Sequence, residues 1–141
     1  LYGALIVDPR TPRAAAVERV LVLGGFDTNG DGRSELYGWN GSAGFFARHP
    51  IKVARGEIVR LYVLNLVPDE PVATFHLHAQ TFDVFRSGTR ATPDEHTDVV
   101  SLTLGERAVL EMRFAEAGRY MFHPHQARMA ERGAMGWIAV V

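Results

Sequence analysis

The chain has 141 residues, a length typical of a single domain, and it contains no cysteine. This composition excludes disulfides, thiol nucleophiles, iron–sulfur clusters and thiolate ligands for zinc or blue copper, so a metal site must use histidine, carboxylate, methionine or backbone groups. With 15 Lys and Arg against 16 Asp and Glu, the net charge of −1 gives no electrostatic reason to expect a nucleic acid or an anionic membrane as partner.

The first residues form an apolar, strand-like run, Leu1–Val7, which is followed by a segment rich in turn-forming residues, Asp8–Ala16. We interpret residues 1–16 as the end of an upstream structural unit followed by a linker. No run in the sequence approaches the roughly 18 apolar residues that are needed to span a bilayer. The pattern of a secretory signal peptide is not found either.

From Val17 onward, short runs rich in β-branched and aromatic residues are separated by Gly, Pro, Asp and Asn. The runs expected to form strands are ERVLVLGGF, IKVA, EIVRLYVLNL, VATFHLHA, TFDVF, TDVVSLTL, RAVLEMRF, RYMFHPH and GWIAVV. The Arg55-Gly56 junction between the second and third runs resembles a hairpin turn. Only Gln126–Arg132 has a helical pattern, of at most two turns. Strands spaced by about 8 to 12 residues predict an all-β fold, a Greek-key β-sandwich or barrel.

Two His-x-His motifs are the main candidates for a functional site. In the first, His76 and His78 lie inside an apolar run, where the alternation of a strand turns both imidazoles to one face. The second motif, His123 and His125, repeats this pattern near the C-terminus. Because neighbouring strands lie about 4.8 Å apart, two adjacent strands with these motifs would bring four imidazoles together. This is an arrangement of metal ligands.

The alternative interpretation is of partly buried histidines whose ring nitrogens bond to backbone carbonyls, as is usual for a single histidine near a strand end. The presence of two such motifs favours the metal site. An all-imidazole set suits copper, zinc, iron or nickel, and the ligand type alone does not choose among them.

The sequence around both motifs resembles one known family. FHLHAQTFDVF and GRYMFHPHQARMAERGAMGWIAVV are similar to a cupredoxin domain of laccase-like multicopper oxidases, in particular the second domain of the two-domain type. The second domain of copper nitrite reductases is more distantly similar. WNGSAGFFARHPIKVARGEIVRLYVLN extends the likeness, and LYGALIVDP resembles the last strand of a preceding cupredoxin domain. The resemblance implies that residues 1–16 are that strand plus a linker and that residues 17–141 are a cupredoxin domain.

This resemblance implies a function for the four histidines. His76, His78, His123 and His125 would bind copper and supply half of a trinuclear (type 2/type 3) site that reduces dioxygen to water. The electrons would come from a small phenolic or metallic reductant. The remaining ligands are expected from a second cupredoxin domain, in the same polypeptide or a neighbouring subunit, with a homotrimer as the implied assembly. The implied location is extracellular or periplasmic, and the isolated chain is expected to be inactive as an oxidase.

Three positions depart from the pattern of the family domains that hold blue type 1 copper. Ala73, Pro124 and Met129 stand where such domains have His, Cys and His, so no blue copper is expected here. Met135 lies near the position of an axial methionine ligand and is predicted to pack in the core instead.

The sequence leaves two other functions open. One is a nitrite-reductase-like site with a single type 2 copper at a subunit interface, although that reductase domain normally offers fewer histidines than two complete motifs. The other is a copper-binding or purely structural cupredoxin domain without turnover, since an electron-entry copper site is missing from the sequence.

The remaining polar motifs are predicted to be structural. Asp27–Gly32 resembles the start of a calcium loop, but Gly38 occupies the twelfth position in place of a bidentate glutamate, which favours a simple loop turn. His49 and His96 are expected to be exposed or locally hydrogen-bonded. Asp98 is left outside the site, because turn formation explains it as well as the orientation of an imidazole does.

Overall fold

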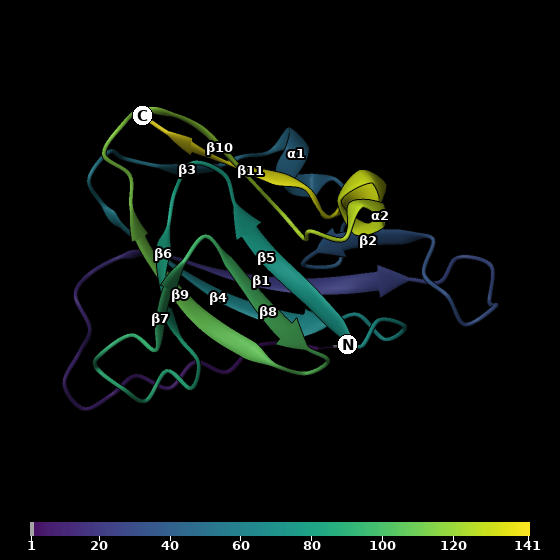
Figure 1. Ribbon diagram of the computed structural model, residues 1–141, viewed down its shortest axis with the longest axis horizontal. Helices are drawn as coiled ribbons and strands as arrows, with labels where there is room; N and C mark the ends of the chain where they lie inside the picture. The colour runs from purple at the N-terminus through teal and green to yellow at the C-terminus, as the bar shows by residue number, and fades with distance from the viewer. Residues whose placement is uncertain (1) are drawn as a thin grey trace.

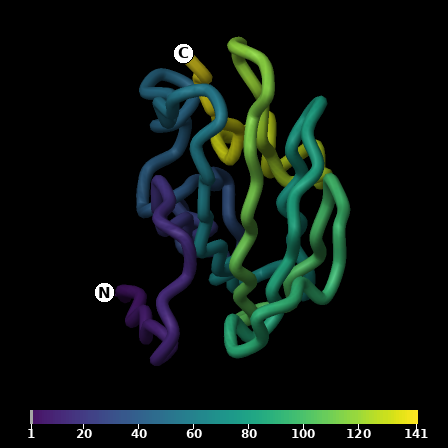
Figure 2. Tube along the Cα trace, turned by 90° about the vertical axis from the view of Figure 1, so that its left-hand side faces the viewer, coloured from purple at the N-terminus to yellow at the C-terminus, as the bar shows by residue number. Residues whose placement is uncertain are grey.

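The computed structural model describes residues 2–141 as a sandwich of two β-sheets (Figures 1 and 2). The strands are β1 (Val17–Phe26), β2 (Leu36–Trp39), β3 (Ile51–Val53), β4 (Ile58–Leu66), β5 (Val72–Leu77), β6 (Phe82–Phe85), β7 (Glu95–Thr97), β8 (Val99–Thr103), β9 (Arg107–Arg113), β10 (Gly118–His123) and β11 (Gly136–Val140). The helical segments are α1 (Phe45–Arg48), α2 (Ala127–Met129) and the following turn η1 (Ala130–Ala134). The predicted all-β sandwich is therefore confirmed.

The two sheets differ in size and in strand order. One sheet has the order β2-β1-β4-β9-β6-β7, and the other has the order β3-β11-β10-β5-β8. Figure 1 shows β5 and β8 of the second sheet crossing in front of β1 and β4 of the first. Strands β5 and β10 are neighbours although more than forty residues separate them, so the chain brings two distant segments side by side at the centre of the five-stranded sheet.

The inward side chains of the two sheets form one apolar core. In β5, Phe75 and Leu77 are fully buried, whereas Thr74 and His76 lie on the outer face, as strand alternation requires. Phe122 of β10 is also fully buried and stacks on Phe75, with ring centroids 5.6 Å apart. Burial of these rings fixes which face of β5 and β10 points into the core. The alternate residues of both strands therefore point to the outer face.

The expected hairpin at Arg55-Gly56 is absent, which corrects the prediction. Strand β3 pairs with β11 in the five-stranded sheet, while β4 pairs with β1 and β9 in the other. The backbone N–H of Arg55 donates to the Val141 carbonyl at 2.9 Å, and that of Gly56 donates to the Phe114 carbonyl at 3.0 Å. The turn therefore carries the chain from one sheet to the other.

Three short elements were not expected from the sequence, one of which is β7 in a polar loop. Strand β2 lies inside the turn-rich stretch before Gly44, and α1 is a single helical turn. Elements this short show too little periodicity to be recognised, and their stability comes from packing against the rest of the fold. The helix expected at Gln126–Arg132 is present as α2 and the turn η1, which extends to Ala134.

The N-terminal segment forms no strand between residues 2 and 16, so the strand-like run has no regular structure there; Leu1 lies outside the described residues. Leu5 and Val7 are 90% and 81% exposed. Farther along, Arg13 contacts the carboxylate of Glu111 at 3.2 Å and lies 4.2 Å above the Phe85 ring. Arg13 therefore holds its part of the N-terminal segment against the six-stranded sheet. Tyr2, Gly3 and Ala4 lie beside Val20 and Val22 of β1, while Leu5 and Val7 project into solvent.

Within the described residues, no helix combines the length and the apolar character that a membrane crossing requires.

Candidate metal centre

The two His-x-His motifs meet at the adjacent ends of β5 and β10. The strands are antiparallel, and their register places His76 directly opposite His123. The backbone N–H of His78 donates to the Met121 carbonyl at 2.9 Å, so the pairing continues one residue beyond β5. The structure thus brings the two predicted motifs onto adjacent strands and the same outer face.

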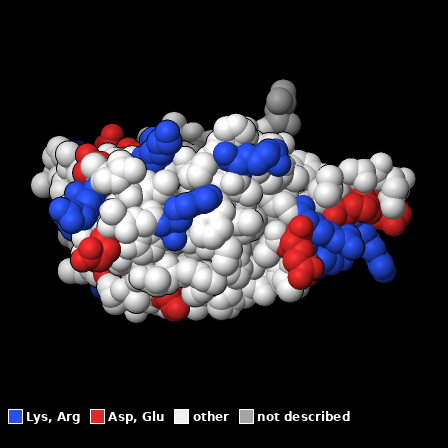
Figure 3. Space-filling view, turned by 90° about the horizontal axis from the view of Figure 1, so that it is seen from above, with Lys and Arg blue, Asp and Glu red and all other residues white. Residues whose placement is uncertain are grey.

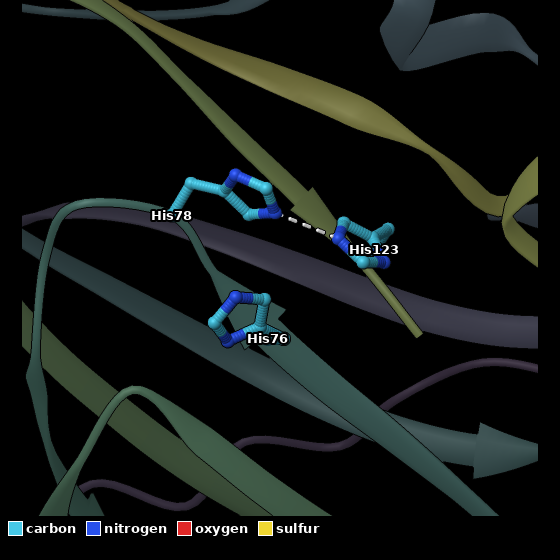
Figure 4. Close-up of side chains that lie close together, drawn as sticks. All are labelled: His76, His78 and His123. Atoms are coloured by element: carbon cyan, nitrogen blue, oxygen red, sulfur yellow. Dashed lines mark hydrogen bonds between the residues drawn. The ribbon is translucent and has the colours of Figure 1, made fainter. Parts of the chain in front are cut away.

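Three of the four imidazoles have converging nitrogens (Figure 4). The ligand atoms that His76, His78 and His123 offer all lie within 4.8 Å of one another. Nε2 of His78 is 2.9 Å from Nε2 of His123, and the two rings point toward each other from different strands. The His76 ring lies with its centroid 4.9 Å from that of His78 and 5.5 Å from that of His123.

His125, the fourth predicted residue, lies at the edge of this cluster. Its ring centroid is 4.3 Å from that of His76 and 5.8 Å from that of His123. The side chain is exposed, as is that of His78, while His76 and His123 are half-buried. The four rings therefore form one patch with an open side toward solvent.

Backbone carbonyls select the tautomers of the two half-buried rings. Nδ1 of His76 lies 2.8 Å from the carbonyl oxygen of Asp98, and Nδ1 of His123 lies 2.7 Å from that of Pro124. A carbonyl only accepts, so each Nδ1 carries the proton and each Nε2 keeps its lone pair. The alternative of histidines satisfied by carbonyls accounts for one nitrogen of these rings and leaves the other free to bind a metal.

The sequence left open whether Asp98 orients an imidazole, and the structure places this residue against His76. Besides its carbonyl bond to His76, its carboxylate Oδ2 lies 3.8 Å from His76 Nδ1. Asp98 reaches this position because β8 pairs with β5 on the side opposite β10, and its carbonyl also accepts the N–H of Leu77 at 3.0 Å. A prediction of the β5–β8 register would have been needed to find this contact.

The electrostatics of the cluster favour neutral imidazoles. Desolvation, followed by repulsion from His123, lowers the pKa of His78 below its ordinary value. Desolvation and the neighbouring His76 lower the pKa of His125 in the same way. Since only the neutral ring coordinates a metal, His78 and His125 remain competent ligands at a lower pH than a free histidine would.

The positions that carry blue-copper ligands in related domains are apolar and buried here. Ala73 is 1% exposed, Met129 is 0% exposed and Pro124 is buried. Met135 is half-buried. The sequence offers no thiolate, and Ala73 and Met129 belong to the hydrophobic core.

The other two histidines have local partners, as predicted. Nδ1 of His49 lies 3.2 Å from the Phe45 carbonyl, and the imidazole stacks on the Phe45 ring. Nδ1 of His96 lies 2.7 Å from the carboxylate Oδ1 of Asp83. Each ring therefore has a structural role in its own loop or strand.

The acidic loop after β1 is a hydrogen-bonded turn that also brings three carboxylates together. The carboxylate of Asp27 accepts backbone N–H groups of Gly32 at 2.8 Å and Gly30 at 2.6 Å, and these bonds lower its pKa. Asp31 and Glu35 bring their carboxylates within 4.8 Å of the same group. In Figure 3 charges of both signs lie close together at this end of the molecule, and much of the remaining surface in view is uncharged.

Comparison with known proteins identifies the family. The multicopper oxidase family model matches residues 15–141. The chain belongs to the multicopper oxidase family. Membership implies copper as the cofactor and places the chain among the oxidoreductases. The all-imidazole donor set of the cluster is one that suits copper.

Relatives show how much of such proteins this chain represents. It is 38% identical over 69 residues to the multicopper oxidase mco of Staphylococcus epidermidis and, over the same length, to that of Staphylococcus aureus. Each alignment covers 47% of this chain and 15% of the relative. The chain therefore spans a small part of the curated relatives that it matches.

Solved structures confirm the cupredoxin-like fold. A multicopper oxidase crystal structure superimposes with a TM-score of 0.93 at 39% identity, covering 96% of this chain and 48% of that one. Copper nitrite reductase from Nitrosomonas europaea gives a TM-score of 0.90 at 24% identity, covering 100% of this chain and 55% of that one. The second similarity is one of fold alone.

Proposed function

We propose that this multicopper oxidase domain supplies half of the histidine ligands of a trinuclear (type 2/type 3) copper site in a laccase-like enzyme. The reaction would couple one-electron oxidation of a small phenolic or metallic reductant to the reduction of dioxygen to water. The observation that carries the proposal is the register of β5 and β10, which sets His76 opposite His123 and gathers four imidazoles on one open face.

The residues of the cluster fit copper in donor type and in protonation. Bound copper would supply a reversible one-electron couple. The chain supplies neutral nitrogen donors, two of them oriented by the carbonyls of Asp98 and Pro124. The contact between His78 and His123 at 2.9 Å requires a shared proton in the metal-free protein. Metal binding at Nε2 would move that proton to Nδ1 of His78, and binding would weaken at low pH because a protonated imidazole does not coordinate.

The open side of the cluster supports a second ligand set from elsewhere. His78 and His125 are exposed, so a facing unit can approach them without displacing any part of the core. We propose that a second cupredoxin domain faces this patch, from the same polypeptide or from a neighbouring subunit of a homotrimer. An interface would also exclude water from the site, which strengthens electrostatic interactions within it.

The N-terminal segment is proposed to be the last strand of a preceding cupredoxin domain plus the linker. Leu5 and Val7 expose apolar side chains of a kind that strands bury, and Arg13 fixes the start of the domain against the six-stranded sheet. An extracellular or periplasmic location is part of the same proposal.

The deciding experiment compares this chain with a longer one that restores an upstream cupredoxin domain carrying its own His-x-His motifs and a type 1 cysteine. At matched copper loading, oxygen consumption with a phenolic reductant should appear only in the longer chain. Bound copper per site should rise to about three in that chain, as a trinuclear arrangement requires. Multi-turnover oxygen reduction by the 141-residue chain alone would refute the half-site proposal.

The same experiment separates the alternatives. Nitrite reduction with one copper per interface would indicate a reductase-like type 2 site. Copper binding without turnover in the longer chain would indicate a copper-binding or purely structural cupredoxin domain. The 39% identity to a multicopper oxidase over nearly the whole chain favours the oxidase.

A further inference from the structure

The backbone pairing between β5 and β10 ends at His123, two residues before His125. The last paired residues are His76 and His123, and continuing the antiparallel register by two residues would place Thr74 opposite His125. In a regular ladder these two residues would exchange backbone hydrogen bonds. The structure has side-chain bonds in their place.

Three hydrogen bonds replace the missing backbone pairing. The backbone N–H of His125 donates to Thr74 Oγ1 at 2.7 Å, and the backbone N–H of Thr74 donates to Gln126 Oε1 at 3.3 Å. Gln126 Nε2 donates to the Val72 carbonyl at 3.1 Å. The glutamine amide thus offers β5 one acceptor and one donor, as the peptide group of a partner strand would.

Pro124 explains why the ladder needs this substitute. Its ring fixes φ near −65°, whereas an antiparallel strand has φ near −140°, so the chain turns out of the sheet at this residue. The backbone groups of Val72 and Thr74 on this side of β5 would lose their partners at that point, and unpaired backbone groups are costly. Thr74 and Gln126 supply the partners.

The replacement matters most for His125. The rings of His76 and His123 are oriented through Nδ1 by carbonyls, but among residues 2–141 no protein group makes a hydrogen bond to the ring of His125. Its position relative to His76 therefore depends on the backbone, and that backbone is bound to β5 through Thr74.

We propose that Thr74 and Gln126 are positioning residues that hold His125 in the copper-binding face. This inference rests on the proposed function of the histidine cluster. Neither residue would contact the metal or a substrate. They act by fixing the position of the His125 backbone, from which the fourth imidazole extends.

The segment after the site is anchored independently, so the proposal can be tested without unfolding it. Met129 is fully buried in the core. Arg128 donates to the carboxylate of Glu70 at 2.9 Å and to the hydroxyl of Tyr37. Loss of the Gln126 amide should therefore loosen the local chain at His125 while α2 stays in place.

The test uses four variants of the 141-residue chain: Thr74→Val, Thr74→Ser, Gln126→Ala and the control Gln80→Ala. Gln80 is the matched control because, within residues 2–141, its amide bonds only to the neighbouring Thr81 carbonyl, at 2.8 Å. Calorimetric titration with Cu(II) measures affinity, and amide hydrogen exchange on the metal-free chain measures how firmly the His125 N–H is held. Circular dichroism confirms that each variant is folded.

Thr74→Val and Gln126→Ala should each weaken Cu(II) binding by roughly 10- to 100-fold, the range typical of groups that orient metal ligands. Exchange at the His125 amide should accelerate by at least about 10-fold in Thr74→Val, because the hydrogen bond that protects it is lost. Thr74→Ser keeps the hydroxyl and should restore both properties, and Gln80→Ala should match the wild type. Unchanged copper affinity in both disruptive variants, or failure of serine to restore it, would overturn the proposal.

A double-mutant cycle shows whether the effect passes through His125. In a His125→Ala background, Gln126→Ala should weaken copper binding no further, because the ligand that it positions is already gone. A full additional loss would contradict the proposal. If the wild-type chain itself bound no copper, the proposed function would fail, while the metal-free exchange rates would still show whether Thr74 holds the His125 backbone.

Discussion

Strands β5 and β10 present two chemically opposite faces within a few residues of each other. The outer face carries the four imidazoles, which are half-buried or exposed and within contact of one another. The inner face carries Phe75, Leu77 and Phe122, all fully buried. A histidine of the outer face can be replaced without opening the core. A residue of the inner face cannot, because each inner side chain packs against several others.

The same comparison separates two kinds of copper chemistry. A blue-copper site in a related domain would use positions 73, 124 and 129, and here these residues are Ala73, Pro124 and Met129, all buried. The histidine face is intact, whereas the side chains beneath it offer only apolar packing. The domain is therefore specialised for the oxygen-side ligands under the proposed function, and its electrons must enter from elsewhere.

The largest effect is expected from the inner face. Phe122→Ala should lower the free energy of unfolding by about 3 to 5 kcal/mol, because it leaves a cavity where Phe75 and Trp39 now pack. Urea unfolding of the metal-free chain measures the change. Under the same conditions His76→Ala should cost far less, and an equal cost would mean that the histidine face is also structural.

Removing an outer-face ligand should act on copper instead. His123→Ala should weaken Cu(II) binding by at least about 100-fold, since His123 lies against both His76 and His78 at the centre of the cluster. Single alanine variants of His76, His78 and His125 should also weaken it. The control variants His49→Ala and His96→Ala should bind as the wild type does in calorimetric titration. A comparable loss in either control would place the site elsewhere.

The free energy of unfolding of the metal-free chain should change with pH by less than it changes in Phe122→Ala, and the sign of this change can be stated. Desolvation and like-charge repulsion lower the pKa of His78 and of His125, so near pH 6.5 the unfolded chain binds more protons than the folded one. The contribution of these groups to stability is therefore complete above about pH 6.5 and is lost as the pH falls below it. Urea unfolding between pH 7.5 and 5.5 measures this slope, and His78→Gln should reduce it. A slope of opposite sign would contradict the assigned shifts.

The smallest expected effect is in the visible absorption spectrum of the copper-loaded chain. The chain loaded with Cu(II) should show no intense blue absorption near about 600 nm, because that band requires a cysteine thiolate and the sequence has none. Absorption spectroscopy at increasing copper loading is the measurement. A strong band from the pure chain would contradict the ligand assignment outright.

Much of the fold followed from local pattern. The long strands β1, β4 and β9 were predicted because each combines several β-branched residues with flanking turn residues. This local pattern indicates a strand without knowledge of its neighbours in the sheet. The Arg55-Gly56 turn was misread, since a tight turn between two strands looks the same whether the strands pair with each other or pass to different sheets. Only the parallel pairing of β3 with β11 decides between them.

The candidate site was predictable to the level of residue type and strand face. Alternation alone places His76 and His78 on one side, and the second motif repeats the argument. The sequence could not choose between a turn and an imidazole partner for Asp98, and it gave no sign of the role of Gln126. Both roles depend on which strands are neighbours and where the β10 ladder stops.

The sequence by itself determined that no metal would be bound through a thiolate, that blue copper was therefore excluded and that the chain would form a β-sandwich. These are properties of composition and short-range periodicity, which act within a few residues. The tertiary structure alone decided that β5 and β10 are neighbours, that His76 stands opposite His123 and that Thr74 and Gln126 take over where their ladder ends. Contacts between segments more than forty residues apart depend on how the two sheets pack, because that packing selects the strand order in which the apolar faces are buried together.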